Sequence, residues 1–282
     1  MKKYQIVKRE ELTDLITMIS VYAPLIAKKA KAGQFIILRV DEEGERIPLT
    51  ICSTTDELVT VVFQKVGATT LALDKLNEGE CLHDFVGPLG VPTEVENLGR
   101  VAVLGGGLGC AIALPIAKAL TEAGNHVDLI AGFKSLEYII LQDEMVKACT
   151  KLHITTDNGS YGIRGFNTLR LKEMIDEGVH YDHVFAIGPL RMMQGVCRIT
   201  KEYGIPTTVS MNPIMIDGTG MCGGCRLTVD GEVKFACVDG PDFDGHKVDF
   251  DEVIARNNTY REFEAQAKEK HACRLGGGAM NG

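Results

Sequence analysis

The sequence predicts an α/β fold with a β-barrel, built as an N-terminal antiparallel barrel, a parallel-sheet domain and a short cysteine-rich segment. Three observations predict it. Over residues 1–97 the apolar and β-branched runs are short and separated by turn residues, which is typical of a small antiparallel barrel. Over residues 98–211 strand-length apolar runs alternate with helical patterns, which indicates βαβ units. Residues 212–250 are rich in Gly, Cys and Asp, and residues 251–282 close the chain.

Length and charge limit the classes of function. The 282 residues are enough for about two domains. The formal net charge is −8, which argues against nucleic acid as a partner because its phosphates favour clustered Lys and Arg. No long apolar segment follows the N-terminus, so we expect no signal peptide, no membrane span and a cytoplasmic location.

The first 97 residues contain the elements expected of the barrel. Residues 13–22 are rich in apolar and β-branched side chains, and Pro24 ends that run. Two further strands are predicted at Phe35–Val40 and Leu58–Phe63. A short helix is expected at Thr69–Leu76, with a threonine hydroxyl at its start.

The alternating pattern begins at residue 100 and predicts a parallel sheet with right-handed crossovers. The expected strands are Val101–Leu104, His126–Ala131, Leu152–Thr155, His183–Ile187 and Thr207–Ser210. The expected helices are Cys110–Ala123, Gln142–Cys149, Phe166–Glu177 and Leu190–Tyr203. A charged, amphipathic helix is expected over residues 251–272, followed by a flexible glycine-rich tail.

The strongest functional signal is the segment Asp217–Cys225, DGTGMCGGC, which we call the cysteine loop. Cys222 and Cys225 have the Cys-x-x-Cys spacing that lets two sulfurs bind one metal or cluster, and Cys237 follows twelve residues later. Residues 226–236 predict a hairpin with an Asp-Gly turn, which would return Cys237 to the loop. The glycines allow a tight fold whose backbone amides stabilise negative charge.

Three cysteines leave one ligand of a 2Fe–2S cluster unassigned, since such a cluster takes four. Asp217 lies five residues before Cys222, where a fourth cysteine is expected, and a carboxylate can bind ferric iron. We therefore predict Asp217, Cys222, Cys225 and Cys237 as the metal ligands. A structural zinc completed by Asp217 or His246 is the alternative, but the long glycine-rich loop favours the iron–sulfur cluster.

A second signal is Gly105-Gly106-Gly107-Leu108-Gly109, between a predicted strand and a predicted helix. Glycine lets the backbone approach a pyrophosphate, and a helix N-terminus favours an anion. The spacing is not G-x-G-x-x-G, and the next strand runs into Gly132-Phe133-Lys134 without an acidic residue. A tight turn without a ligand is therefore the alternative interpretation.

Two weaker signals are best read as structural when they are taken alone, and a third lies where ligands of open sheets bind. Residues 46–50, with sequence RIPLT, suggest an edge strand that contains a proline. Residues 67–70, with sequence GATT, suggest a helix start. Gly188-Pro189 follows a strand of the parallel sheet, at the end where ligands of open sheets bind.

These motifs, in this order, resemble the ferredoxin–NADP reductase superfamily over about residues 4–260. The order of barrel, nucleotide domain and cysteine loop resembles the electron-transfer subunits of dihydroorotate dehydrogenase. Residues 44–50, 212–222 and 235–241 are more similar to the small subunits of NADH-dependent reduced ferredoxin:NADP+ oxidoreductases, also described as sulfide dehydrogenase small subunits. In that family one Asp and three Cys hold the cluster, whereas the dihydroorotate subunits carry four cysteines, so Asp217 favours the former.

The resemblance also implies further site residues, with FAD on the barrel and NAD(H) on the parallel sheet. The FAD-binding residues would be Arg46, Pro48, Leu49, Thr50, Gly67, Thr69 and Thr70. The NAD-binding residues would be Gly105, Gly106, Gly107, Leu108, Gly109, Gly188 and Pro189. No side chain is implied as a general acid or base, because the chemistry belongs to the cofactors.

The function implied by the resemblance is flavin-based electron bifurcation in a heterodimer. A hydride would pass between NAD(H) and FAD, and single electrons between FAD and the 2Fe–2S cluster. The partner would be a larger subunit with a second FAD, 4Fe–4S clusters and the NADP(H) site, and ferredoxin would act through it. Two alternatives stay open: the electron-transfer subunit of a dihydroorotate- or sulfide-dehydrogenase-type complex, and a zinc-stabilised, non-enzymatic nucleotide-binding module.

The residues do not decide between NAD and NADP. The usual acidic residue for the ribose hydroxyl is missing after the second parallel strand. Lys134 is suited to a 2′-phosphate, but an isolated surface lysine is more often simply solvated. The preference for NAD rests on the resemblance alone.

Overall fold

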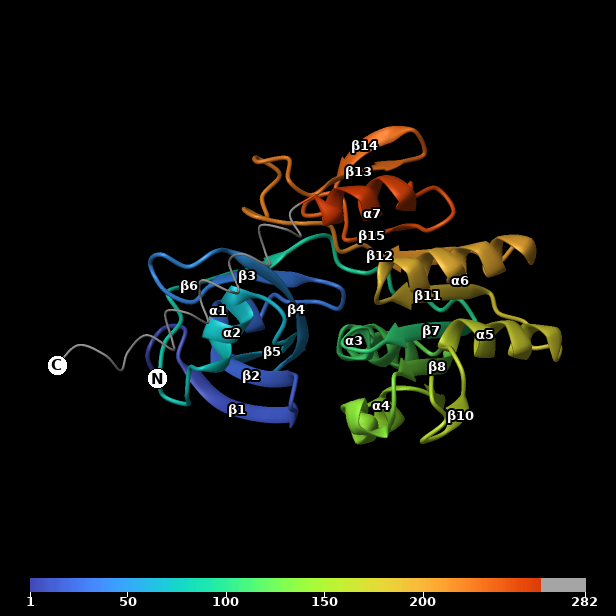
Figure 1. Ribbon diagram of the computed structural model, residues 1–282, viewed down its shortest axis with the longest axis horizontal. Coiled ribbons are helices and arrows are strands. Elements are labelled where there is room, and N and C mark those ends of the chain that lie inside the picture. The colour runs from blue at the N-terminus through green and yellow to red at the C-terminus, as the bar shows by residue number, and fades with distance from the viewer. Residues whose placement is uncertain (260–282) are drawn as a thin grey trace, which may run out of the picture.

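A computed structural model of the protein describes residues 1–259 and divides them into a barrel-like sheet, a parallel sheet with helices, and a small C-terminal unit (Figure 1). The last described helix, α7 (Phe250–Asn258), coincides with the start of the helix expected over residues 251–272. The rest of that expected helix and the expected flexible tail lie outside the described residues.

The N-terminal sheet is antiparallel and has six strands in the order β1-β2-β5-β4-β3-β6. Its strands are β1 (Ile6–Thr13), β2 (Ile16–Tyr22), β3 (Phe35–Arg39), β4 (Ile47–Thr54), β5 (Leu58–Gln64) and β6 (Asp84–Leu89). The short helices α1 (Pro24–Ala27) and α2 (Ala68–Asp74) accompany it. The chain just before β6 bonds back to β1, through the amide of Ile6 to Glu80 and that of Leu82 to Tyr4. The two edges therefore meet, and the sheet is barrel-like.

Strand β4 corrects one expectation, because it is a central strand rather than an edge strand. Its first half pairs with β3, with Pro48 opposite Ile37, and its second half pairs with β5 from Ile51 onward. A register shift separates the two halves. Proline lacks an N–H donor, and Pro48 lies in the half that has no ladder to β5, so its missing donor leaves no bond unmade.

The second sheet has seven strands in the order β10-β9-β8-β7-β11-β12-β15, all parallel except β15. Its strands are β7 (Arg100–Gly106), β8 (His126–Phe133), β9 (Lys151–Thr156), β10 (Ile163–Arg164), β11 (His183–Ile187), β12 (Thr207–Ser210) and β15 (Asp242–Asp244). Its helices are α3 (Gly109–Glu122), α4 (Gln142–Ala148), α5 (Asn167–Asp176) and α6 (Leu190–Glu202), with the 3-10 turn η1 (Leu136–Tyr138). The strand order reverses between β7 and β11, and ligands of open sheets bind at such a point.

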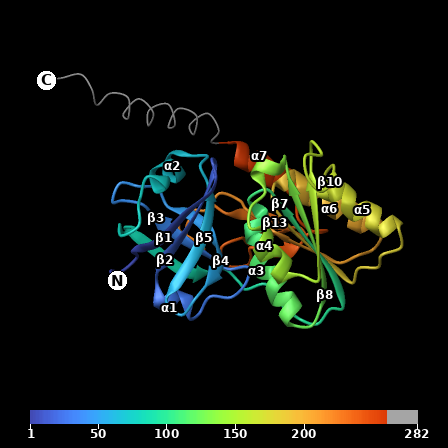
Figure 2. The same cartoon turned by 90° about the horizontal axis from the view of Figure 1, so that it is seen from below.

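Side chains of β7 alternate between two cores on the two faces of this sheet. Val101 and Val103 pack with α3 and with Val62 of the barrel. Ala102 and Leu104 pack on the other face, with α5 and α6. Helix α3 therefore lies between the two sheets (Figure 2) and fixes the barrel against the parallel sheet.

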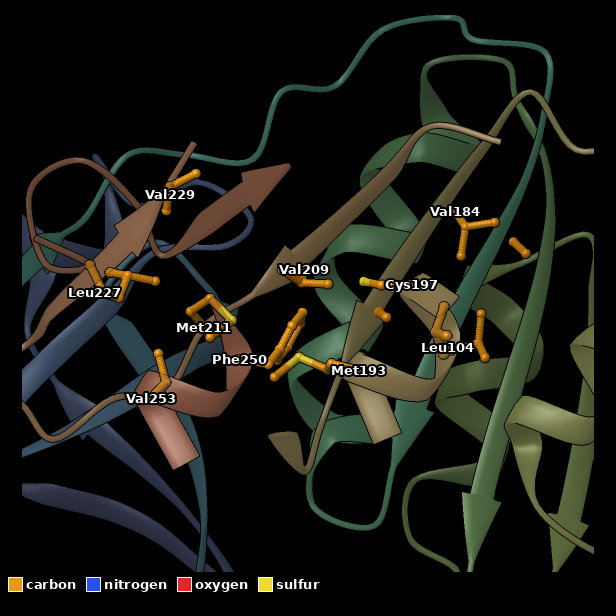
Figure 3. Packing of buried hydrophobic residues seen from close by; sticks show 14 of the residues in the cluster. Leu104, Val184, Met193, Cys197, Val209, Met211, Leu227, Val229, Phe250 and Val253 are labelled. Carbon is orange, nitrogen blue, oxygen red and sulfur yellow. The ribbon is translucent and has the colours of Figure 1, made fainter. Parts of the chain in front are cut away.

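The C-terminal unit consists of the hairpin β13 (Arg226–Val229) and β14 (Glu232–Phe235), the edge strand β15 and helix α7. The two-residue turn is Asp230-Gly231, and both residues have positive φ, as the Asp-Gly signal predicts. Leu227 of the hairpin and Phe250 of α7 share one buried core with Met193 of α6 (Figure 3). The unit is therefore packed onto the parallel sheet rather than tethered to it.

Among residues 1–259, no helix combines the length and the apolar character needed to cross a membrane.

Candidate functional site

A cavity of about 710 Å³ lies between the barrel and the carboxyl edge of the parallel sheet. Three parts of the chain line it: strands β2 to β5 of the barrel, the strand ends of the parallel sheet, and the segment Ser210–Met215 that leads to the cysteine loop. Its volume is within the range of small-molecule and cofactor sites. The cavity therefore brings together the barrel, the glycine turn of the parallel sheet and the segment that leads to the cysteine loop.

Gly106, Gly107, Leu108, Gly109, Gly188 and Pro189 all line the cavity, at the point where the strand order reverses. Gly105 does not line it. A Cβ at Gly109 would come within 2.5 Å of the carbonyl oxygen of Ile187, and one at Gly106 within 2.6 Å of the sulfur of Met192. Gly109 therefore lets α3 pack closely on the end of β11, and Gly106 leaves room for the Met192 side chain of α6.

Gly107 differs from its neighbours. It has a φ of +56°, and a Cβ there would meet nothing within 4 Å. Its backbone is held by a bond of 2.8 Å from its amide to the carbonyl of Gly132. The open space at Gly107 is where a ligand could approach the backbone directly at the start of α3, as a pyrophosphate does at a helix N-terminus.

Asn167, at the start of α5, supports the glycine turn from the opposite face. Its amide nitrogen donates to the carbonyl of Gly105 at 2.8 Å, and the side chain is buried. Asn167 also lines the cavity. The sequence carries no motif that singles it out, because an asparagine near a helix start is usually explained by capping.

On the barrel side, Pro48, Leu49 and Thr50 line the cavity, while Arg46 does not. Arg46 is exposed and stands just before β4. Pro48 and Thr50 pair with Ile37 and Phe35 of β3. This ladder gives the cavity a firm wall that a flat, apolar ring could lie against.

The remaining predicted FAD contacts, Gly67, Thr69 and Thr70, lie outside the cavity at the start of α2. The Thr70 hydroxyl accepts from the amide of Gly67 at 2.9 Å, so it caps the helix. The Thr69 hydroxyl donates to Glu45 at 3.2 Å, next to Arg46. The structure thus brings the helix start beside the residues that precede β4, although neither belongs to the cavity wall.

Two charged residues line the cavity at its far end, beyond strands β8 and β9 of the parallel sheet. Lys134 follows β8, as the sequence indicates, and Asp157 follows β9. The amide of Asp157 bonds the carbonyl of Phe133 at 3.0 Å, which holds the two strand ends together. An acidic residue therefore does line this end of the cavity, but it comes from the adjacent strand β9, so sequence spacing along β8 alone does not reveal it.

The cysteine loop holds Asp217 beside Cys222. One carboxylate oxygen of Asp217 accepts from the amide of Thr219 at 2.8 Å, and the other accepts from the amide of Cys222 at 2.9 Å. The pKa of Asp217 is lowered mainly by the hydrogen bond from the Thr219 amide. A hydrogen bond from the Cys222 thiol to the carboxylate lowers it further. Asp217 is therefore ionised, as a ligand of iron must be.

Cys225 and Cys237 form the second pair of predicted ligands. Both are buried, and their side chains bond each other. Burial, followed by the neighbouring Cys225, raises the pKa of the Cys237 thiol to about 12. A bound metal ion would supply the positive charge needed to hold such a thiol deprotonated. Amides also point at sulfur in the loop: Gly224 N–H lies 3.4 Å from the sulfur of Cys222.

The four predicted ligands thus come as two pairs, which fits a 2Fe–2S cluster because each of its irons takes two protein ligands. Within residues 1–259, no three His, Cys, Asp or Glu side chains are grouped as a site for a single metal ion. His246, the alternative zinc ligand, bonds Thr200 of α6 at 2.9 Å instead.

The cysteine loop begins close to the cavity. Met215 lines the cavity and Asp217 follows two residues later, so their Cα atoms are at most ~7 Å apart. Gly218 is packed so tightly on the barrel that a Cβ there would come within 2.8 Å of Ile37 and 2.9 Å of Leu89. The cysteine loop therefore starts beside the cavity and is anchored against strands β3 and β6 of the barrel.

Comparison with known proteins identifies the same parts. Residues 212–249 match the model of the iron-sulfur cluster binding domain of dihydroorotate dehydrogenase B. The chain is 44% identical over 268 residues to the dihydroorotate dehydrogenase B (NAD(+)) electron transfer subunit homolog of Thermotoga maritima, covering 94% of both. It is 32% identical to the dihydroorotate dehydrogenase B (NAD(+)) electron transfer subunit of Clostridium perfringens, over 82% of this chain and 92% of that one.

A solved structure extends the likeness to nearly the whole chain. It is a chain of the NADH-dependent reduced ferredoxin-NADP oxidoreductase, described for flavin-based electron bifurcation. The two are 41% identical with a TM-score of 0.91, over 96% of this chain and 99% of that chain. The fold is thus that of ferredoxin–NADP reductase-like proteins, as the sequence predicts. The chain belongs to the family of dihydroorotate dehydrogenase B electron-transfer subunits and their homologues, which are electron-transfer subunits of oxidoreductases.

Proposed function

We propose that this chain is the NADH-oxidising electron-transfer subunit of an electron-bifurcating NADH-dependent reduced ferredoxin:NADP+ oxidoreductase. It binds FAD against the barrel, NAD(H) on the parallel sheet and a 2Fe–2S cluster in the cysteine loop. The proposal is supported by the match to a bifurcating oxidoreductase over 96% of the chain. A larger partner subunit carries a second FAD, 4Fe–4S clusters and the NADP(H) site, and ferredoxin acts through that partner.

The observation that carries this function is the continuity of the cavity and the cysteine loop. One cavity meets the barrel wall at Thr50, the glycine turn at Gly107 and the segment at Met215 that leads to Asp217. Two-electron and one-electron sites are thus adjacent within a single chain. A nucleotide-sensing module would not need a charged, cysteine-rich loop at the same cavity.

The residues of the chain act by binding and by excluding water. The backbone at Gly107 and the start of α3 hold a pyrophosphate, and Pro48 and Thr50 offer a wall for a flavin ring. FAD and the cluster supply the redox chemistry, since FAD takes up a hydride and releases electrons singly to iron. Asp217, Cys222, Cys225 and Cys237 hold the cluster as two pairs of ligands. We place the protein in the cytoplasm, because a reducing compartment preserves thiolate ligands.

A dihydroorotate-oxidising complex is the second candidate, favoured by the match of residues 212–249. Asp217 argues for the bifurcating type, since the dihydroorotate subunits resemble this chain but carry a fourth cysteine there. Purification of the native complex distinguishes the two candidate functions. A partner subunit with 4Fe–4S clusters supports bifurcation, and a flavin-binding partner subunit with a barrel fold supports dihydroorotate oxidation.

The first experiment is anaerobic purification of the full chain, with a visible spectrum and with iron, zinc and flavin counted on one sample. We expect a flavin band with broad iron–sulfur absorption, two irons and one FAD per chain. The chain alone should oxidise NADH with an artificial acceptor but should not reduce NADP+ with ferredoxin. A colourless, zinc-bearing protein that accepts neither cofactor on reconstitution would refute the proposal.

A further inference from the structure

A buried carboxyl group stands directly behind the wall of the cavity and has no part in the function described so far. Asp242 begins β15 and is the register partner of Ser210 on β12. Ser210 and Pro241, which precedes Asp242, both line the cavity. Side chains of register partners lie on the same face of a sheet. The carboxyl of Asp242 therefore lies behind Ser210, which separates it from the cavity.

The contacts of this carboxyl are incomplete. The hydroxyl of Thr93 donates to Oδ2 at 2.5 Å, and the hydroxyl of Ser210 also interacts with the carboxyl group. The other oxygen, Oδ1, is buried and has no hydrogen-bond partner within the described residues. Burial raises the pKa of Asp242, and the two hydroxyls oppose that effect only in part. An unsatisfied buried polar atom is rare in proteins and calls for an explanation.

No positive charge compensates Asp242 within residues 1–259. The strand β12 presents Ser210 to it, and the segment before β7 presents Thr93. Asp244 of β15 and His183 of β11 interact with each other, and no charged group is among the causes that shift the pKa of Asp242. Asp242 forms none of the ion pairs recorded in the molecule. Its charge is thus free to act on whatever occupies the cavity.

The end of the cavity beside Ser210 is the end where a redox-active ring belongs. The opposite end, at Lys134 and Asp157, is polar and lies over β8 and β9. The Ser210 end is enclosed by Met211 and Met215 and leads to the cysteine loop. Electrons that reach the loop must leave from that side. Single electrons reach the loop from FAD, so on the proposed function the flavin ring lies towards that end of the cavity. The nicotinamide ring, which exchanges a hydride with the flavin, is then the part of the dinucleotide nearest Ser210.

We propose that Asp242 is a positioning residue that makes the site discriminate oxidised from reduced nicotinamide. The oxidised ring carries a positive charge that the reduced ring lacks, so an ionised carboxylate behind Ser210 stabilises NAD+ selectively. The linkage is reciprocal: NAD+ favours the ionised carboxylate, and a proton leaves Asp242 when NAD+ binds to its neutral form. NADH, whose ring is uncharged, binds without this proton release. The inference rests on the proposed function, because it needs a dinucleotide in the cavity.

The test uses the full chain loaded with its cofactors and measures binding by calorimetry between pH 5 and pH 9. The ligands are NAD+, NADH and ADP-ribose, which lacks the nicotinamide. In the wild type we expect the affinity for NAD+ to rise about tenfold as pH rises through the pKa of Asp242, as for two charges in a protein interior. The affinities for NADH and ADP-ribose should not follow that curve.

Asp242→Asn keeps the shape of the side chain and removes its charge. This variant should bind NAD+ about tenfold more weakly at high pH and should lose the pH dependence, with unchanged ADP-ribose binding. Asp244→Asn, on the same strand but exposed, is the matched control and should behave as the wild type. Proton release on NAD+ binding to the wild type, followed in weakly buffered solution near the pKa, needs no variant.

The outcomes separate this inference from the function it rests on. If ADP-ribose binds but Asp242→Asn keeps the wild-type pH curve for NAD+, the role of Asp242 is refuted and the dinucleotide site stands. Absence of proton release with NAD+ would refute it independently. If none of the three ligands binds, the proposed function itself fails, and this inference fails with it.

Discussion

The glycine turn after β7 and the cysteine loop are both built for anionic groups, yet they are held in opposite ways. The turn is fixed by packing: Gly109 has no room for a side chain, and Asn167 bonds the backbone of the turn at Gly105. The loop is fixed by its own polar groups, and Met221 at its tip is 89% exposed. A phosphate site can thus be complete before its ligand arrives, whereas a cluster site needs the metal to complete it.

The largest effect should come from the buried pair of the loop. Cys237→Ser should remove the cluster, with iron falling from two per chain to near zero, because serine is a much poorer ligand for iron than thiolate. FAD and ADP-ribose should still bind, since the cavity does not include Cys237. Iron analysis and the reduced-state EPR signal measure the loss. Cys197→Ser, at a buried cysteine of α6 outside the loop, is the control and should keep its iron.

Asp217→Ala should also lose or destabilise the cluster while FAD remains bound, because one iron would lack a ligand. Asp217→Cys should restore iron binding and change the absorption spectrum, since a thiolate would replace the harder oxygen donor. An Asp217→Ala variant with unchanged iron content and an unchanged EPR signal would show that this carboxylate is not a ligand.

A substitution in the glycine turn should lower the stability of the fold rather than the iron content. Gly109→Ala places a methyl group within 2.5 Å of a carbonyl oxygen of β11, and overpacking of this kind costs about 3 kcal/mol. Denaturant unfolding of the full chain measures it. Gly67→Ala, where a Cβ would meet nothing within 4 Å, is the matched control. Equal stability of the two variants would contradict the claim that packing fixes the turn.

Asp128, near the amino end of strand β8 in the same sheet, should make the stability of the fold sensitive to acid. Burial alone would raise the pKa of Asp128, but the neighbouring side chains lower it to about 2; they are His153, Arg100 and Tyr181. The carboxylate therefore stabilises the fold by about 2 kcal/mol above pH 4, and this contribution is lost as pH falls toward 2. Asp128→Asn should be less stable than the wild type at pH 7, and the difference should shrink below pH 4. A difference that does not change with pH would contradict it.

The smallest effect is expected at Gly107, where the backbone is open to the cavity. Gly107→Ala adds about 1 kcal/mol of strain, because φ is +56°, and its methyl group would stand where a pyrophosphate approaches. ADP-ribose should bind roughly tenfold more weakly, while FAD content is unchanged. Calorimetry measures both. Wild-type affinity for ADP-ribose would place the phosphate elsewhere.

Much of the fold follows from the sequence, because periodicity and turn residues are local. The strands at His183–Ile187 and Thr207–Ser210 and the Asp230-Gly231 turn are as predicted. The central position of β4 is not as predicted, because a proline usually indicates an edge strand. Here the half of β4 that contains the proline pairs only with β3, and the sequence does not show this one-sided pairing. The short strands β10 and β15 carry no periodic signal, because two or three residues cannot show one.

The site divides in the same way. The cysteine loop and the glycine turn have spacings that chemistry alone explains, so their residues could be named in advance. Asp157, Asn167 and Asp242 could not, because each matters through a neighbour on another strand or helix. The separation of Arg46 and Gly67 from the cavity is also invisible in sequence, since it depends on how β4 and α2 are placed in space.

Strand β15 has a consequence for the stability of the parallel sheet in solution. It covers β12 with an antiparallel ladder from Thr208 to Ser210, although it belongs to the segment that carries the cluster ligands. A chain that ended at residue 211 would leave β12 with open N–H and C=O groups, and uncovered edges of this kind recruit strands from other molecules. The cysteine-rich segment therefore also protects the edge of the parallel sheet from pairing with other copies of the chain. Such a shortened chain should form oligomers in solution.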